Sequence, residues 1–301
     1  MNTTRRHHLD IIRVLAVALP VSALALSGCA TNTPEETAPP AAEPTTVEPV
    51  DTPEPTTEPT AEPTPETVTA MVYFPLDTRN GFVLGREPRE VPDEPTMAGV
   101  VEAMIAGPED PDYGAVWNPA TTVNSVTVAG GVITVDLSAD ARTANVGSAL
   151  AGLMVEQLVW TVTDAAKDPS LAVQLTIDGA PAGELWGAIV WETPVTRGDP
   201  MANRLLVGID NLAEGATVTS PVVVSGEANV FEATLLWKVL DANGAEVQSG
   251  FATSAEGQTF APYSFEVTLP AGTYTVVVSE SDPSDGAGGT PMSDSRRITV
   301  G

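Results

Sequence analysis

Residues 150–162 read LAGLMVEQLVWTV and lie inside a long helix that we predict over residues 143–166. Large apolar residues recur there every four positions, which places on one helix face Leu150, Met154, Leu158 and Val162. Further apolar residues between them, such as Trp160, widen the surface beyond a single stripe. A helix of this kind is buried on more than one side, so other elements must pack around it.

The segments on both sides of this helix predict strands. Alternating or β-branched residues bounded by turn signals indicate strands at residues 68–74, 81–85 and 172–177. A hairpin is expected where the alternation Val126, Val128 meets Gly130-Gly131 and resumes at Ile133, Val135 and Leu137. Each strand is short, so the sheet they form is expected to be small.

A second helix is predicted to begin at Pro95 and to end at Gly107-Pro108. Its apolar residues follow the spacing of one helix face, at Met97, Val100, Val101, Met104 and Ile105. The resulting order β-β-α-β-β-α-β predicts an α+β domain over residues 68–192, with two helices on one face of a small mixed sheet.

Residues 203–301 show no helical period, and a linker is expected at residues 193–202. Short alternating segments separated by turn signals occur at residues 222–224, 235–239, 265–269, 274–278 and 298–300. About seven strands in about 100 residues are typical of an all-β immunoglobulin-like sandwich. Trp237 is expected near the centre of its core.

The first 28 residues have the features of an export signal: basic residues, an apolar run and small residues at the end. The sequence Leu26-Ser27-Gly28-Cys29 resembles the lipobox of bacterial lipoproteins, in which the cysteine thiol is acylated and becomes the first residue. Cys29 is the only cysteine of the chain, which leaves no partner for a disulfide. We therefore expect lipidation at Cys29 and a lipid anchor in the membrane.

Residues 29–67 are rich in Pro, Glu and Thr and contain no basic residue. Proline and like charges favour an extended chain, so this segment is expected to be a disordered linker that holds the folded part away from the membrane. The few lysines and the abundant Ala, Val and Thr are typical of proteins from GC-rich genomes such as those of actinobacteria.

Composition excludes several classes of function. The net charge of −27 opposes binding to nucleic acid. The two histidines, His7 and His8, fall in the signal segment, so the exported chain has no His-based triad or zinc site. Two acidic loops, 109–112 and 282–286, lack the ligand spacing of an EF-hand. No metal, cofactor or catalytic residue is predicted.

Several motifs in order resemble the GerMN domain, which is named for sporulation and spore germination and occurs in actinobacterial lipoproteins. They are Ala103–Pro108, Asn118–Thr121, Val132–Ser138 and Glu156–Thr163. Ala120 departs from that family, which often has glycine there. Ser220–Gly226, Phe231–Ala233 and Asp285-Gly286 resemble the immunoglobulin-like Gmad2 domain, which commonly accompanies GerMN. The resemblance implies a GerMN–Gmad2 lipoprotein whose first domain is similar to ring-building modules of secretion-like complexes. It also implies a role like that in sporulation or germination or, as in some actinobacterial relatives, a link to sensor-kinase signalling.

Four residues are candidates for a partner surface: Trp186, Trp191, Phe231 and Glu232. The two tryptophans could stack on wall glycan, although packing at a domain junction is the simpler interpretation. Phe231 could face a partner and Glu232 could form a salt bridge, although a structural turn before the Trp237 strand is simpler.

Together these features predict a non-catalytic, extracytoplasmic lipoprotein at the outer face of the cell membrane. It would bind or assemble with an envelope protein. The alternatives are a module that binds peptidoglycan or another wall polymer and, with less support, a hydrolase that uses two carboxylates. No carboxylate pair is singled out by its spacing.

Overall fold

The fold begins with a long hairpin formed by β1 (Thr67–Thr78) and β2 (Gly81–Pro92). The structure is a computed structural model, and it describes residues 66–94, 96–282 and 287–301. β2 is longer than the predicted strand at residues 81–85, because it pairs with β1 along its whole length despite two prolines. The hairpin forms a two-stranded sheet of its own.

A four-stranded sheet has the order β3-β4-β5-β6, from β3 (Val123–Ala129), β4 (Val132–Leu137), β5 (Ala172–Ile177) and β6 (Ala180–Pro181). β4 and β5 are parallel and the other pairs are antiparallel, so the sheet is mixed as predicted. A short hairpin follows, made of β7 (Gly183–Leu185) and β8 (Ile189–Trp191).

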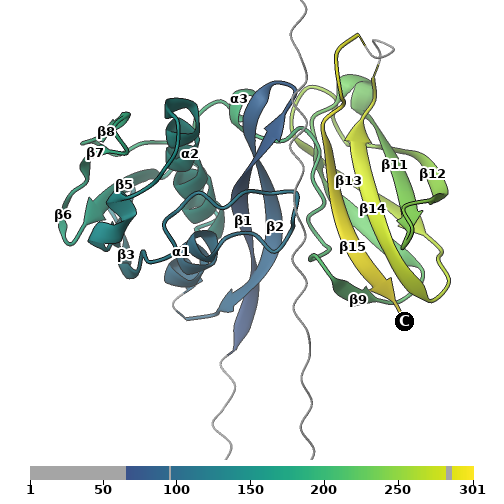
Figure 1. The fold of residues 1–301 in the computed structure, drawn as a ribbon, viewed down its shortest axis with the longest axis horizontal. Coiled ribbons are helices and arrows are strands. Elements are labelled where there is room, and N and C mark those ends of the chain that lie inside the picture. The colour runs from purple at the N-terminus through teal and green to yellow at the C-terminus, as the bar shows by residue number, and fades with distance from the viewer. Residues whose placement is uncertain (1–65, 95, 283–286) are drawn as a thin grey trace, which may run out of the picture. The chain divides into compact units, whose positions relative to one another are not determined.

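Two helices, α1 (Thr96–Ala106) and α2 (Ser148–Ala165), lie between the β1–β2 hairpin and the four-stranded sheet (Figure 1). α2 has buried residues around most of its circumference, which confirms the expectation from residues 150–162. Its start was predicted five residues too early. Residues 139–142 form the 3-10 turn η1 (Ala139–Arg142), and Gly147 is the N-cap of α2.

The C-terminal part is all-β, as expected for an immunoglobulin-like domain. Its described residues form the strands β9 (Ala216–Val218), β10 (Val222–Ala228), β11 (Thr234–Asp241), β12 (Glu246–Thr253), β13 (Ala261–Val267), β14 (Gly272–Glu280) and β15 (Ser293–Val300). One sheet has the order β12-β11-β14-β15-β9, and β10 pairs with β13 in the other. The alternation missed β9, which has only three residues, and β12, whose residues are largely exposed.

The core of this part is built from Val, Leu and Ile side chains contributed by both sheets. Trp237 is half-buried and packs against that core, so its predicted central position is wrong. Its indole instead covers Gly250, the opposite residue on β12, and stacks on Phe265 with ring centroids 5.0 Å apart. A glycine in a strand leaves room for an aromatic ring of the neighbouring strand.

A four-residue helix, α3 (Pro200–Asn203), lies at the predicted end of the linker. Residues 61–301 form one compact unit. None of the helices in the described part of the chain has the length and apolarity needed to span a bilayer.

Candidate functional site

The two tryptophans proposed as a glycan platform are packed into the protein. Trp191 ends β8 and is 1% exposed, within the core of the N-terminal part. Trp186 is half-buried, donates a hydrogen bond to the Ala141 carbonyl oxygen at 2.9 Å and meets Trp117 edge-on. An accessible surface at Trp191 is therefore a wrong prediction, and the residue is packed within the core of the N-terminal part rather than at a domain junction.

Phe231 and Glu232 form the 3-10 turn η2 (Phe231–Ala233) directly before β11, in agreement with the simpler interpretation. Glu232 takes the left-handed conformation with a φ of 54° and is exposed. Phe231 is 62% exposed, so its ring remains available to a partner. Cys29 and its lipobox, Leu26, Ser27 and Gly28, lie outside the described residues.

The acidic loop at residues 109–112 has a structural role that its sequence did not reveal. The buried carboxylate of Glu87 accepts backbone hydrogen bonds from Glu109 and Asp110, each at 2.9 Å, and so holds the loop against β2. This places Asp110 beside the Arg296 guanidinium, whose side chain is 0% exposed. A buried arginine with carboxylate partners is the residue type best suited to such a pair.

Arg296 lies at the centre of a network that joins the N-terminal and C-terminal parts of residues 61–301. Its Nη1 donates to Asp110 and, at 2.7 Å, to Asp294. Its Nη2 donates to the Arg86 carbonyl oxygen at 2.7 Å. Tyr113 Oη donates to Asp294 at 2.7 Å, so three residues of the first part bind two of the second.

A second ion pair strengthens this junction. Arg86 on β2 binds Asp210 in a bidentate geometry, from Nε at 2.8 Å and from Nη2 at 2.6 Å. Bidentate arginine–carboxylate pairs restrict orientation more than single contacts do. The same Nη2 lies 2.9 Å from Glu227, which also binds Arg204. The junction is therefore held by directional, buried charges.

Two carboxyl groups of the network have raised pKa values. Burial raises the pKa of Asp110 from 3.8 to about 6, and the Arg296 guanidinium offsets part of that rise. Burial likewise raises the pKa of Asp294 against the opposing effect of Arg296. Paired carboxyls with raised pKa values can serve a hydrolase, but both side chains here are almost fully buried and bound to Arg296. Substrate has no access to them in this arrangement.

The raised pKa of Asp110 predicts a pH dependence of stability. Between about pH 4 and 6 the folded protein keeps a proton on Asp110 that the unfolded chain has already released. The contribution of this group therefore falls as the pH rises through that window. In urea unfolding at pH 4.5, 5.5 and 6.5, we expect Asp110→Asn to lose stability less steeply than the parent. An equal slope in both proteins would contradict the assignment.

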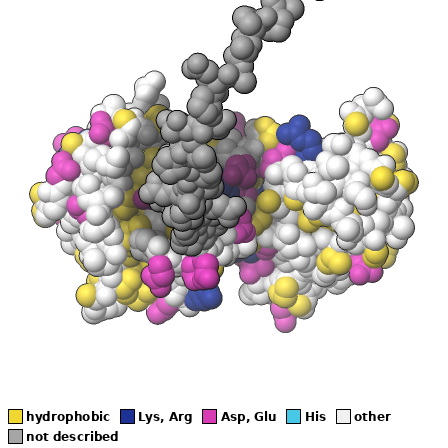
Figure 2. All heavy atoms as spheres, turned by 90° about the horizontal axis from the view of Figure 1, so that it is seen from below, with side chains coloured by type: hydrophobic (Ala, Val, Ile, Leu, Met, Phe, Trp, Pro, Cys, Tyr) yellow, Lys and Arg dark blue, Asp and Glu magenta, His cyan; other side chains and the backbone are white. Residues whose placement is uncertain are grey.

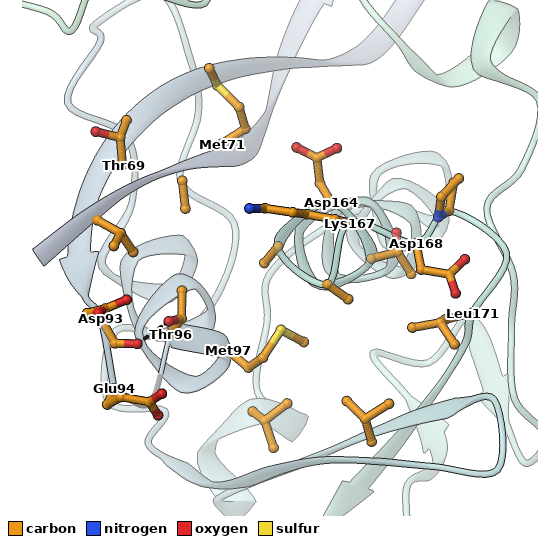
Figure 3. A pocket seen from close by; sticks show the side chains of 18 of the residues that line it. Thr69, Met71, Asp93, Glu94, Thr96, Met97, Asp164, Lys167, Asp168 and Leu171 are labelled. Carbon is orange, nitrogen blue, oxygen red and sulfur yellow. Dashed lines mark hydrogen bonds between the residues drawn. The ribbon is translucent and has the colours of Figure 1, made fainter.

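An open groove of about 1160 Å³ lies in the N-terminal part. It is bordered by β1, by the start of α1, by the end of α2 and by β3 (Figure 3). Met71 and Met97 supply apolar surface, and the Lys167 side chain extends into the middle of the groove. Small-molecule sites usually measure about 300–1,000 Å³, so this groove has the size for a longer ligand.

Acidic groups surround the groove: Asp93, Glu94, Asp164 and Asp168. Arg197 also lines it, but its guanidinium pairs with Asp164 at 3.5 Å and lies over the Trp160 ring. Acidic side chains are also spread over the face drawn in Figure 2, where Lys and Arg show in few places. The lining carries four carboxylates against the two cations Lys167 and Arg197, and this net negative charge suits a ligand with positive charge.

Sequence reasoning missed both the network and the groove, because their residues come from distant segments. A signal for the network was present in β15. Asp294 and Arg296 alternate in phase with the core residues Ile298 and Val300, so the period of two places both charges on the buried face. Buried charges in a strand need partners, and that need predicts an ion pair.

Comparisons with known proteins agree with this architecture. The family model described as sporulation and spore germination matches residues 71–183. The Gmad2 model, described as an immunoglobulin-like domain of bacterial spore germination, matches residues 206–287. A search of curated proteins gave no match.

Three solved structures resemble parts of the chain. The first GerMN domain of the sporulation protein GerM from Bacillus subtilis is 24% identical, with 44% of this chain and 100% of that chain covered and a TM-score of 0.34. The tandem GerMN domains of the same protein are 20% identical, with 67% and 62% covered and a TM-score of 0.34. A putative lipoprotein from Clostridium perfringens is 18% identical, with 43% and 87% covered and a TM-score of 0.31.

The order of the two family matches follows the order of the two folds. The α+β part with its mixed sheet falls in the first match, and most of the β-strands of the sandwich fall in the second. Residues 71–183 therefore match the sporulation and spore germination family and residues 206–287 match the immunoglobulin-like Gmad2 family, which gives the chain a GerMN–Gmad2 architecture.

Proposed function

We propose that this protein is a non-catalytic, lipid-anchored module that binds a protein partner in the cell envelope. The observation that carries the proposal is the pairing of two germination-related domains in one chain, behind a cysteine in a lipobox-like context. Neither family description names a reaction. The junction around Arg296 supports a role in contact, because buried ion pairs hold the two domains in a fixed arrangement.

The anchor is tested at Cys29. In the parent we expect a mature N-terminus at Cys29 with acyl chains, seen by mass spectrometry, and recovery in the membrane fraction. Cys29→Ala removes the thiol that would be acylated, so the protein should move to the soluble fraction or retain its signal segment. Ser27→Ala is the control, because it leaves the thiol in place. A parent protein with an unmodified Cys29 would contradict the anchor.

The partner is tested by crosslinking in intact cells followed by affinity capture of the lipidated protein from membranes. A reproducible envelope protein should be recovered with the parent and should be reduced with Cys29→Ala, which removes the protein from the membrane surface. Failure to recover any such protein in repeated captures would count against a binding role.

A wall-polymer role has weaker support. Of the two tryptophans expected to stack on glycan, Trp191 is buried and Trp186 is half-buried with its indole N–H bonded. The test is a pull-down of the protein on purified wall material. Retention there without any crosslinked protein partner would favour this second function.

A further inference from the structure

The groove in the N-terminal part borders the free edge of β1. Four consecutive residues of that strand line it, Val68, Thr69, Ala70 and Met71. Because neighbouring strand residues point to opposite faces of a sheet, four in a row can line one groove only where the strand edge itself is open to it. β1 pairs with β2 on its other side, and no described strand pairs with this edge.

The orientation of the edge groups follows from Tyr73. Its N–H donates to Thr161 Oγ1 at 3.3 Å and its carbonyl oxygen accepts from Gln157 Nε2 at 2.7 Å, both on α2. The backbone of Tyr73 therefore points away from β2. In an antiparallel ladder this orientation recurs every second residue, and the register with β2 is unbroken. The N–H and C=O groups of Met71 and Thr69 must therefore also point away from β2.

The prolines of the hairpin agree with this assignment. Pro88 lies opposite Met71 and Pro92 lies opposite Thr67. Proline has no N–H to give to a ladder, so it fits only where the paired residues do not bond to each other. Pro75 on β1 is also a position whose backbone points away from β2. Its carbonyl oxygen accepts a hydrogen bond from the Gly114 N–H at 2.7 Å.

The outward carbonyl oxygens of Tyr73 and Pro75 have partners, whereas the outward groups of Thr69 and Met71 meet the groove. None of the described residues donates to or accepts from the backbone of these two residues on that side. Free backbone groups along a strand edge are a template for another strand. An extended peptide adds to such an edge in several known recognition modes.

The side chains around the β1 edge determine which charge and which apolar residues a bound peptide should have. Met71, Met97 and Val126 provide apolar contacts, while Asp93 and Glu94 place negative charge at the rim. The linker at residues 29–67 contains acids and no basic residue, and a second copy of the chain carries a net charge of −27. Both would be repelled, so charge complementarity favours a basic segment of another protein.

We propose that the β1 edge binds an extended, basic segment of an envelope protein as an added β-strand. This rests on the proposed function, because it names the site at which that partner would bind. The strand would bond to the free N–H and C=O groups of Thr69 and Met71. Its alternate side chains would contact the apolar floor, and its lysines or arginines would lie near Asp93 and Glu94.

The test uses the lipidated full-length protein in detergent and a blocked octapeptide of alternating valine and lysine as the probe. Calorimetry should detect binding of this probe. The valine–glutamate peptide should bind at least tenfold more weakly, and a probe with two valines replaced by proline should lose binding. Hydrogen exchange of residues 67–72 should slow when the probe is bound. Equal binding of all three peptides, or none by the first, would overturn the proposal.

Two pairs of variants separate the edge from its surroundings. Thr69→Pro removes the outward N–H at a position where proline is compatible with the β2 ladder, and it should abolish binding, whereas Thr69→Val keeps the N–H and should bind normally. Glu94→Gln at the rim should weaken binding, whereas Glu102→Gln, exposed on α1 outside the groove, should not. If Thr69→Pro does not fold, the same question is answered by the proline-containing probe, which should fail to bind the parent protein.

The outcomes are distinguishable from a failure of the proposed function. Loss of the crosslinked partner in Thr69→Pro cells would support the inference. A partner that is still captured from cells expressing folded Thr69→Pro would leave the binding role intact and overturn the β1 site.

Discussion

Arg296→Leu is expected to lower the free energy of unfolding by roughly 3–5 kcal/mol. The change removes the guanidinium that binds Asp110 and Asp294 and leaves both carboxylates buried without their cation. The loss should be smaller at pH 5 than at pH 8, because the pKa of Asp110 is raised to about 6 and this carboxyl can bind a proton at the lower pH and avoid buried negative charge. Urea unfolding at the two pH values measures both effects.

The neighbouring residue provides a matched control. Arg297 pairs with Glu214, but its side chain is 61% exposed. Exposed ion pairs contribute about 0–1 kcal/mol, so Arg297→Leu should change the free energy of unfolding by less than about 1 kcal/mol. Similar losses for the two variants would show that Arg296 does not hold the junction as described.

Trp191→Ala is expected to cost roughly 3–5 kcal/mol of unfolding free energy. The side chain is almost fully buried in the core of the N-terminal part, and its removal leaves a large cavity. The result would also bear on the wall-polymer interpretation, since a variant that loses binding because it unfolds says nothing about stacking. Thermal or urea unfolding should therefore precede any binding assay of this variant.

Two substitutions complete that test. Val190→Ala alters a side chain that is 66% exposed and should stay within about 0.5 kcal/mol of the parent. Trp191→Phe should lower the free energy of unfolding much less than Trp191→Ala does. It keeps an aromatic ring and removes an indole N–H for which no described residue is a partner. A stable Trp191→Ala protein would contradict the packing described for this residue.

Much of the fold could be predicted because its signals are local. The period of α1, the hairpin turn at Gly130-Gly131 and the alternation of β14 each depend on residues close in sequence. Errors occurred where local signals compete. The strand predicted at residues 81–85 ends before Pro88 and Pro92, yet β2 continues through both, because they occupy positions that require no ladder hydrogen bond.

The candidate site residues also differ in whether local sequence or long-range packing determines their environment. Phe231 was correctly associated with a turn, because the turn is a local feature. Trp186 and Trp191 could not be assigned to surface or core from their own segment, since burial depends on what packs over it. Asp110 looked like part of a solvated acidic loop until its partner, 186 residues away in the chain, was known.

The order of residues along the chain was sufficient to define the two domain types, the acidic character and the candidate lipid attachment at Cys29. These properties follow from composition, period and short motifs, which need no knowledge of distant contacts. The ion pairs around Arg296 and the open edge of β1 depend instead on folding, because they arise where segments far apart in the chain meet. Long-range packing sets which charges are buried and which backbone groups remain unpaired, and no local pattern contains that information.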